Sequence, residues 1–191
     1  MAVFAGVFLA VWIALGYGFW VSVTPEIWAQ KGAYAAFALA GWALYRRVLP
    51  VWFAPAQSSQ QPFALAGAGF GVLAGLTLAL PVLLLGQTGA LSGTQASWPV
   101  VVLLGVLVPP LEEILYRDGL QRYLAGHCPP ALAVAVSSAV FGLVHPFPAS
   151  VYVAFCGLVF GVLYWRYGLI SAILAHAVYN LSLLLAPWVF H

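Results

Sequence analysis

The stretch from Val101 to Leu124, VVLLGVLVPPLEEILYRDGLQRYL, decides how the chain is read. It is apolar and has the length of a membrane-crossing helix, which needs about 20 residues. Yet it contains Glu112, Glu113 and Arg117. Each such charge costs roughly 2.5–3.5 kcal/mol near the bilayer centre on insertion scales. Because charged side chains in membrane segments face the bundle interior, the three together indicate a polar centre within the membrane.

The composition of the whole chain also indicates a membrane protein. Of its 191 residues, 64% are hydrophobic and 5% are charged, and the mean hydropathy is +1.04. A soluble domain has about 25% charged residues, so this chain has too few polar side chains to cover a globule in water. The net charge of +2 gives no reason to expect nucleic acid as a partner. Two cysteines in separate segments indicate neither a disulfide framework nor a zinc motif.

Apolar segments alternate along the chain with short breaks rich in Gly, Pro and polar residues. We therefore expect an all-α fold, a polytopic membrane bundle of about seven transmembrane helices. The chain reads as one domain over residues 1–191. The last breaks, GHCPP, HPFPAS and RYG, are tight, so the C-terminal helices should be antiparallel neighbours. The expected segments are 1–23, 32–54, 63–86, 99–124, 130–146, 150–166 and 169–188.

The basic residues predict the orientation of these spans. Arg46 and Arg47 end the second segment, Arg122 ends the fourth, and Arg166 ends the sixth. With about seven spans these positions lie on one side of the membrane, and Lys31 lies on the other. Because Lys and Arg favour cytoplasmic loops, we expect an integral, multi-pass protein with its N-terminus in the cytoplasm.

Helical spacing gives the two adjacent glutamates different surroundings. Glu113 and Arg117 are four residues apart, so they share a helix face and can form an ion pair. Glu112 is rotated by about 100° from Glu113, so it needs another partner or loses its charge on burial. Two titratable groups in different environments are typical of acid/base sites. A buried salt bridge that only fixes helix packing accounts for Glu113 and Arg117 but not for Glu112.

Two later segments supply further polar side chains. The stretch FGLVHPFP places His145 near the end of the fifth segment, one turn after Phe141. The stretch LAHAVYNLSLLL places His176 and Asn180 on one face of the seventh. Polar groups at membrane depth are commonly functional, which makes these residues candidates for the same site. The alternative for His176 and Asn180 is interhelical hydrogen bonding.

Three short motifs now stand in order on hydrophobic segments: EEILYR, FGLVH and HAVYN. They resemble the Glu-Glu-x-x-x-Arg, Phe-x-x-x-His and His-x-x-x-Asn motifs of the CPBP family of intramembrane glutamic endopeptidases. This is the CAAX-protease and bacteriocin-processing group. The resemblance covers about residues 99–185, which would hold the catalytic motifs.

The resemblance implies a peptidase that hydrolyses a peptide bond without a metal or another cofactor. Glu112 would be the general base that activates a water, which it shares with His145. His176 and Asn180 would hold the oxyanion of the tetrahedral intermediate. Structural support would come from Glu113, Arg117 and Phe141.

The resemblance also limits the substrate and the location. It admits a membrane-associated protein or peptide with a prenylated C-terminus, a bacteriocin or pheromone precursor, or the C-terminal sorting tail of a surface protein. The lipid bilayer would be the other partner. A prokaryotic inner membrane is the expected location.

Two alternatives stay open at this stage. Glu112, His145 and His176 could form a zinc site of the kind found in zinc peptidases, although no H-E-x-x-H helix is present in the sequence. The chain could also be a transporter or a catalytically inactive membrane scaffold, because intramembrane charges mark transport pathways as well. Against a transporter, the sequence has no inverted repeat.

Overall fold

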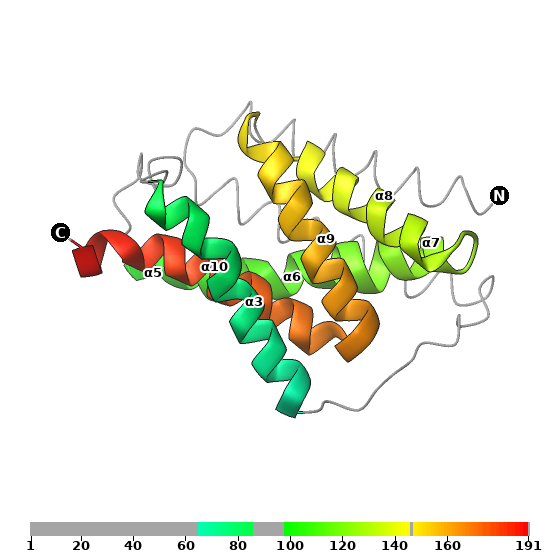
Figure 1. Ribbon diagram of the computed structural model, residues 1–191, viewed down its shortest axis with the longest axis horizontal. Helices are drawn as coiled ribbons and strands as arrows, with labels where there is room; N and C mark the ends of the chain where they lie inside the picture. The colour runs from blue at the N-terminus through cyan, green and yellow to red at the C-terminus, as the bar shows by residue number, and fades with distance from the viewer. Residues whose placement is uncertain (1–64, 86–97, 146, 191) are drawn as a thin grey trace. The chain divides into compact units, whose positions relative to one another are not determined.

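The computed structural model describes residues 65–85, 98–145 and 147–190, and every regular element within them is a helix (Figure 1). The described residues divide into two compact units. The first contains Ile114–Gly157, and the second contains 98–113 together with 65–85 and 158–190. The expected segments 1–23 and 32–54, with the basic residues used to orient them, lie outside the described residues.

Helices that are long and apolar enough to cross a membrane lie close to the expected segments. There are four of them in the described part, and Pro130–Leu143 (α8) is a shorter apolar helix. The four are α3 (Leu65–Leu84), the helix Trp98–Ala125, α9 (Ala149–Tyr167) and α10 (Leu169–Phe190). Together with α8, these four helices match the last five expected segments to within a few residues. The prediction of an all-α, polytopic membrane protein is therefore confirmed.

In the second unit, α3 crosses α10 at close range (Figure 1). Gly67, Gly71 and Gly75 recur every fourth residue on α3 and are buried. A Cβ atom on Gly71 would lie 2.5 Å from the carbonyl oxygen of Ser171 on α10, and the hydroxyl of Ser171 donates to the carbonyl of Gly67 at 2.7 Å. Small residues at this spacing allow helix backbones to approach closely in a membrane.

The turn that leads into α10 also depends on a glycine. Gly168 separates α9 from α10 and has a φ of 88°, a conformation that other residues rarely adopt. Its N–H donates to the carbonyl of Tyr164 at 2.9 Å, which closes the last turn of α9. This is the tight break that the sequence RYG predicts.

The helix Trp98–Ala125 alternates between α and π geometry. The cause of the first π turn is local, because Pro109 and Pro110 follow it and have no N–H to donate. The N–H of Val108 donates to the carbonyl of Leu103, which is the i→i+5 pattern of a π-helix. The successive elements are α5 (Trp98–Val102), η1 (Leu103–Leu107), α6 (Val108–Glu113), η2 (Ile114–Gln121) and α7 (Arg122–Ala125).

In the first unit, η2 and α7 pack against α8, and α8 packs against the first half of α9. A Cβ atom on Gly142 of α8 would lie 2.6 Å from the Cβ of Ala154, and one on Gly157 of α9 would lie 3.2 Å from the Cβ of Ser138. The aromatic core of this unit includes Phe141, which is 1% exposed. Small residues thus bring α8 and α9 together here, as they do for α3 and α10.

Candidate active site

In the second unit, α10 places His176 against the end of α6, where the two adjacent glutamates lie. The Nδ1 atom of His176 is 2.9 Å from Oε1 of Glu113, and its Nε2 atom is 3.7 Å from Oε2 of Glu112. All three side chains are buried, with exposed fractions of 4% for His176, 4% for Glu112 and 0% for Glu113. The imidazole therefore lies with one ring nitrogen toward each carboxylate.

The two contacts differ in kind. A separation of 2.9 Å is a hydrogen bond between Glu113 and His176, whereas 3.7 Å is too long for a direct one. It is nevertheless short enough for a single oxygen atom to bond to both Glu112 and His176. Within the residues that the structure describes, no hydrogen bond engages the carboxylate of Glu112. That carboxylate is therefore available to a water molecule or a substrate.

Helical spacing places Glu113 and Glu112 on separate faces of their helix. In the structure the carboxylates of both nevertheless approach His176. The reason lies in the imidazole, whose two nitrogens point away from different edges of one ring. Side chains that diverge by about 100° around a helix can thus meet the same residue.

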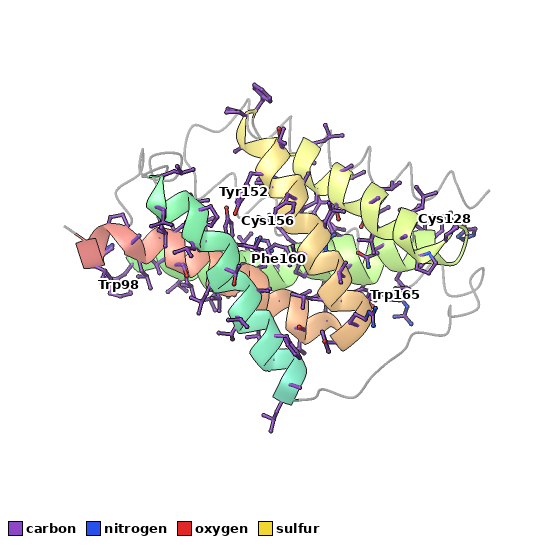
Figure 2. The ribbon with its side chains drawn as sticks, in the orientation of Figure 1. Trp98, Cys128, Tyr152, Cys156, Phe160 and Trp165 are labelled. Atoms are coloured by element: carbon purple, nitrogen blue, oxygen red, sulfur yellow. The ribbon has the colours of Figure 1, made fainter. Side chains whose placement is uncertain are left out.

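A third contact covers one face of the His176 ring. Phe160 projects from α9 (Figure 2), and its ring stacks on the imidazole with centroids 5.0 Å apart and planes inclined by 17°. Phe160 is 1% exposed, so the stack is shielded. No motif indicated this residue, because it is one of 12 phenylalanines and lies in a mostly apolar helix.

Asn180 lies one turn after His176 on α10, as the sequence predicts, and contacts the first π turn. Its Nδ2 atom donates to the carbonyl of Leu104 at 2.8 Å. In the i→i+5 register of a π-helix, the N–H of residue 109 would donate to the carbonyl of Leu104. Residue 109 is a proline, which has no N–H. The amide of Asn180 thus takes the place of a backbone donor, and its second Nδ2 hydrogen remains for another acceptor.

In the first unit, His145 is fixed by the residue one turn before it. Its Nδ1 atom lies 2.8 Å from the carbonyl oxygen of Phe141. A carbonyl only accepts hydrogen bonds, so Nδ1 carries the proton, and in the neutral ring the Nε2 atom is an acceptor. The rings of Phe141 and His145 also meet edge to face, with centroids 5.1 Å apart. The Phe-x-x-x-His motif therefore sets both the orientation and the tautomer of His145.

Arg117 is buried in the same unit and links η2 to α8. One guanidinium nitrogen donates to the hydroxyl of Ser137 at 3.4 Å, and the guanidinium carbon lies 5.3 Å from the ring centroid of Phe141. The hydroxyl of Ser137 in turn donates to Oε1 of Gln121 at 3.2 Å. The exposed fraction of Arg117 is 0%, so these contacts lie in the interior of the unit.

Among the described residues, no group of three or more His, Cys, Asp or Glu side chains has the spacing of a metal site. The ligands of the zinc alternative belong to both units: His145 to the first, and Glu112 and His176 to the second. Metal analysis of the purified protein tests this alternative.

Comparison with known families identifies this part of the chain. Residues 94–182 match the family model described as type II CAAX prenyl endopeptidase Rce1-like. This segment is similar to an Rce1-like domain. The match contains all three motifs and confirms the family resemblance that they indicated. No curated protein sequence and no solved structure matches the chain. Together with the four helices of the described part that are able to cross a membrane, the Rce1-like match supports an endopeptidase that is an integral membrane protein.

Proposed function

We propose that the protein is an intramembrane endopeptidase in which Glu112 activates the attacking water. The observation that carries the proposal is the buried contact of His176 with two carboxylates. Among the described residues, Glu113 is hydrogen bonded to the ring and Glu112 accepts no hydrogen bond. Such a carboxylate beside a ring nitrogen suits a general base. The Rce1-like match supplies independent support for peptidase chemistry.

The proposed reaction uses four side chains. Glu112 accepts a proton from water while His145 shares the same water. The water oxygen then bonds to the carbonyl carbon of the scissile peptide. His176 and Asn180 donate to the resulting oxyanion, which such donors stabilise strongly because it forms only in the reaction. When the C–N bond breaks, Glu112 returns its proton to the leaving nitrogen, and the carboxylate is regenerated.

The proposed substrate is a prenylated protein held at the membrane. The family description names a prenyl endopeptidase, and an acyl or prenyl chain that enters the bilayer holds its peptide near the surface. We place the reaction on the cytoplasmic side of a prokaryotic inner membrane, where Arg122 and Arg166 mark the expected cytoplasmic ends of their helices. Precursor peptides and C-terminal sorting tails are the competing substrates.

The test compares turnover by the purified full chain in detergent micelles. Its substrates are a fluorogenic peptide with a farnesylated cysteine and the same peptide without the lipid. Glu112→Gln should lower turnover by about 10²–10⁴-fold, the range for loss of a general base, with an unchanged melting temperature. Near-normal turnover in this variant would show that Glu112 is not the base.

Asp118→Asn is the matched control, because it also converts a carboxylate to an amide in the helix Trp98–Ala125. Asp118 pairs with Arg122 at 2.9 Å in a partly exposed ion pair, and such pairs contribute little to stability. This variant should keep full turnover. Faster cleavage of the lipidated peptide than of the unlipidated one would support the substrate class, and the reverse order would favour precursor peptides or sorting tails.

A further inference from the structure

Helix α9 supplies none of the motif residues, yet one of its side chains, Phe160 (Figure 2), lies against the ring of His176. Both residues belong to the second unit. The ring centroids are 5.0 Å apart and the ring planes are inclined by 17°, so the two rings stack nearly parallel. Phe160 is 1% exposed and His176 is 4% exposed. The stack is therefore a buried contact with a side chain that the proposed reaction uses.

A hydrogen bond at the edge of an imidazole does not by itself fix the plane of the ring. In His176 that bond joins Nδ1 to Glu113 at 2.9 Å. The torsion that turns an imidazole about its Cβ–Cγ bond has a broad energy well. Because a hydrogen bond weakens steeply only when its angle falls below about 120°, the ring can tilt by roughly 30° without losing it. A contact on the face of the ring is what restricts such a tilt.

Phe160 provides a contact of this kind. If the imidazole turned about its Cβ–Cγ bond, one edge would move toward the phenyl ring, and a densely packed interior gives the phenyl ring little room to move away. Two aromatic rings also attract each other beyond the burial of their area when they stack. A leucine at position 160 would fill much of the same volume, but it would present no flat surface to the imidazole.

We infer that Phe160 is a positioning residue that acts through His176. By holding the plane of the imidazole, it directs Nε2 toward the oxygen atom that Glu112 and His176 are close enough to share. The inference rests on the proposed function, in which His176 acts on the oxyanion. It also gives α9 a part in the site, because α9 brings a ring to the face of His176 while α6 brings carboxylates to its edge.

The kinetic test separates this role from simple filling of the core. In the purified full chain, Phe160→Leu should lower kcat by about 2- to 13-fold, the rate equivalent of one aromatic stack. KM should change less than about twofold, as expected when the lost interaction acts in the transition state. Phe160→Tyr keeps a ring and should recover most of the loss. A wild-type kcat for Phe160→Leu, or an equal loss in Phe160→Tyr and Phe160→Leu, would overturn the inference.

Leu163→Ala is the matched control for stability. Leu163 lies on α9 one turn after Phe160 and is 8% exposed. Removing this buried side chain should lower the melting temperature at least as much as Phe160→Leu does, but it leaves the stacked ring in place. When both variants are assayed well below their melting temperatures, Leu163→Ala should keep a kcat close to that of the wild type. An equal loss of kcat in the two variants would show that packing alone is responsible and would overturn the inference.

A second readout does not depend on turnover. In protein labelled with ¹³C-histidine, the ring current of Phe160 should shift the carbon-bound ring protons of His176 upfield, and His176→Gln identifies their signals among the four histidines. Phe160→Leu should abolish the shift, and Leu163→Ala should retain it. Unshifted His176 signals in the wild-type protein would overturn the inference even if Phe160→Leu failed to fold. If no peptide were cleaved while the shift was present in the wild type and lost in Phe160→Leu, the proposed function would fail and the stack would stand.

Discussion

Replacing Gly75 by alanine tests whether the close approach of α3 and α10 holds the site in place. A Cβ atom at this position would lie 2.5 Å from the carbonyl oxygen of Ala175, 2.9 Å from the Cβ of Val178 and 3.1 Å from the backbone nitrogen of Tyr179. Ordinary contact begins at 3.4 Å, so α10 has to move away by up to about 0.9 Å. Two of the three atoms belong to the backbone, so a change of rotamer cannot relieve the clash.

The expected effect on stability is smaller than the effect on activity. Overpacking costs about 1–3 kcal/mol, and alanine regains about 1 kcal/mol of helix propensity over glycine. The net loss of about 0–2 kcal/mol lowers the melting temperature by a few degrees, at about 2–4 °C per kcal/mol. Ala175 directly precedes His176, so the displacement moves the imidazole relative to Glu113. A misplacement of about 1 Å can reduce a rate by about 10²-fold.

The chain provides a matched control for Gly75→Ala on the same helix. A Cβ atom on Gly69 would have no atom within 4 Å, so Gly69→Ala should leave turnover unchanged and the melting temperature equal or slightly higher. Melting temperatures and turnover of the two purified variants give the comparison. If Gly75→Ala and Gly69→Ala behaved alike in both measurements, the argument that the glycine contact positions His176 would be refuted.

Two further outcomes follow from the site. Pro109→Ala supplies an N–H that can donate to the carbonyl of Leu104, so it should compete with Asn180 and lower kcat toward the value for Asn180→Ala. Turnover equal to wild type would argue against this anchoring of the amide. If Glu112 and His145 activate water directly, chelators should leave turnover unchanged, and elemental analysis should find no stoichiometric zinc. One zinc per active chain, lost together with activity, would decide for the zinc alternative.

The membrane spans could be predicted from the sequence because the signal is one-dimensional. Apolar runs of about 20 residues, separated by Gly- and Pro-containing breaks, place the last five segments within a few residues of the observed helices. The pairing of His176 with Asn180 on one face also follows from a spacing within one helix. The family followed from motif order, and residues 94–182 match it.

The contacts around His176 could not be predicted in the same way. Helical spacing says which residues share a face of one helix, but not which edge of a side chain on another helix will meet them. Glu113 was assigned to Arg117 because the two are four residues apart on one helix. Its bond to His176 instead joins residues that are 63 positions apart in the sequence. No sequence pattern marked Phe160 as a site residue, because its stacking on His176 depends on how α9 and α10 pack.

The irregularity of the helix Trp98–Ala125 and the polarity of the site have a common explanation. In hydrocarbon, a backbone carbonyl without a donor costs several kcal/mol, so proline pairs inside a membrane helix require a compensating partner. At Leu104 that partner is Asn180, a side chain that the proposed reaction also needs. The backbone gap created by Pro109 therefore orients one proposed oxyanion donor, while the carboxylate of Glu113 orients the other. A regular α-helix would have satisfied its own carbonyls and left the amide of Asn180 without this anchor.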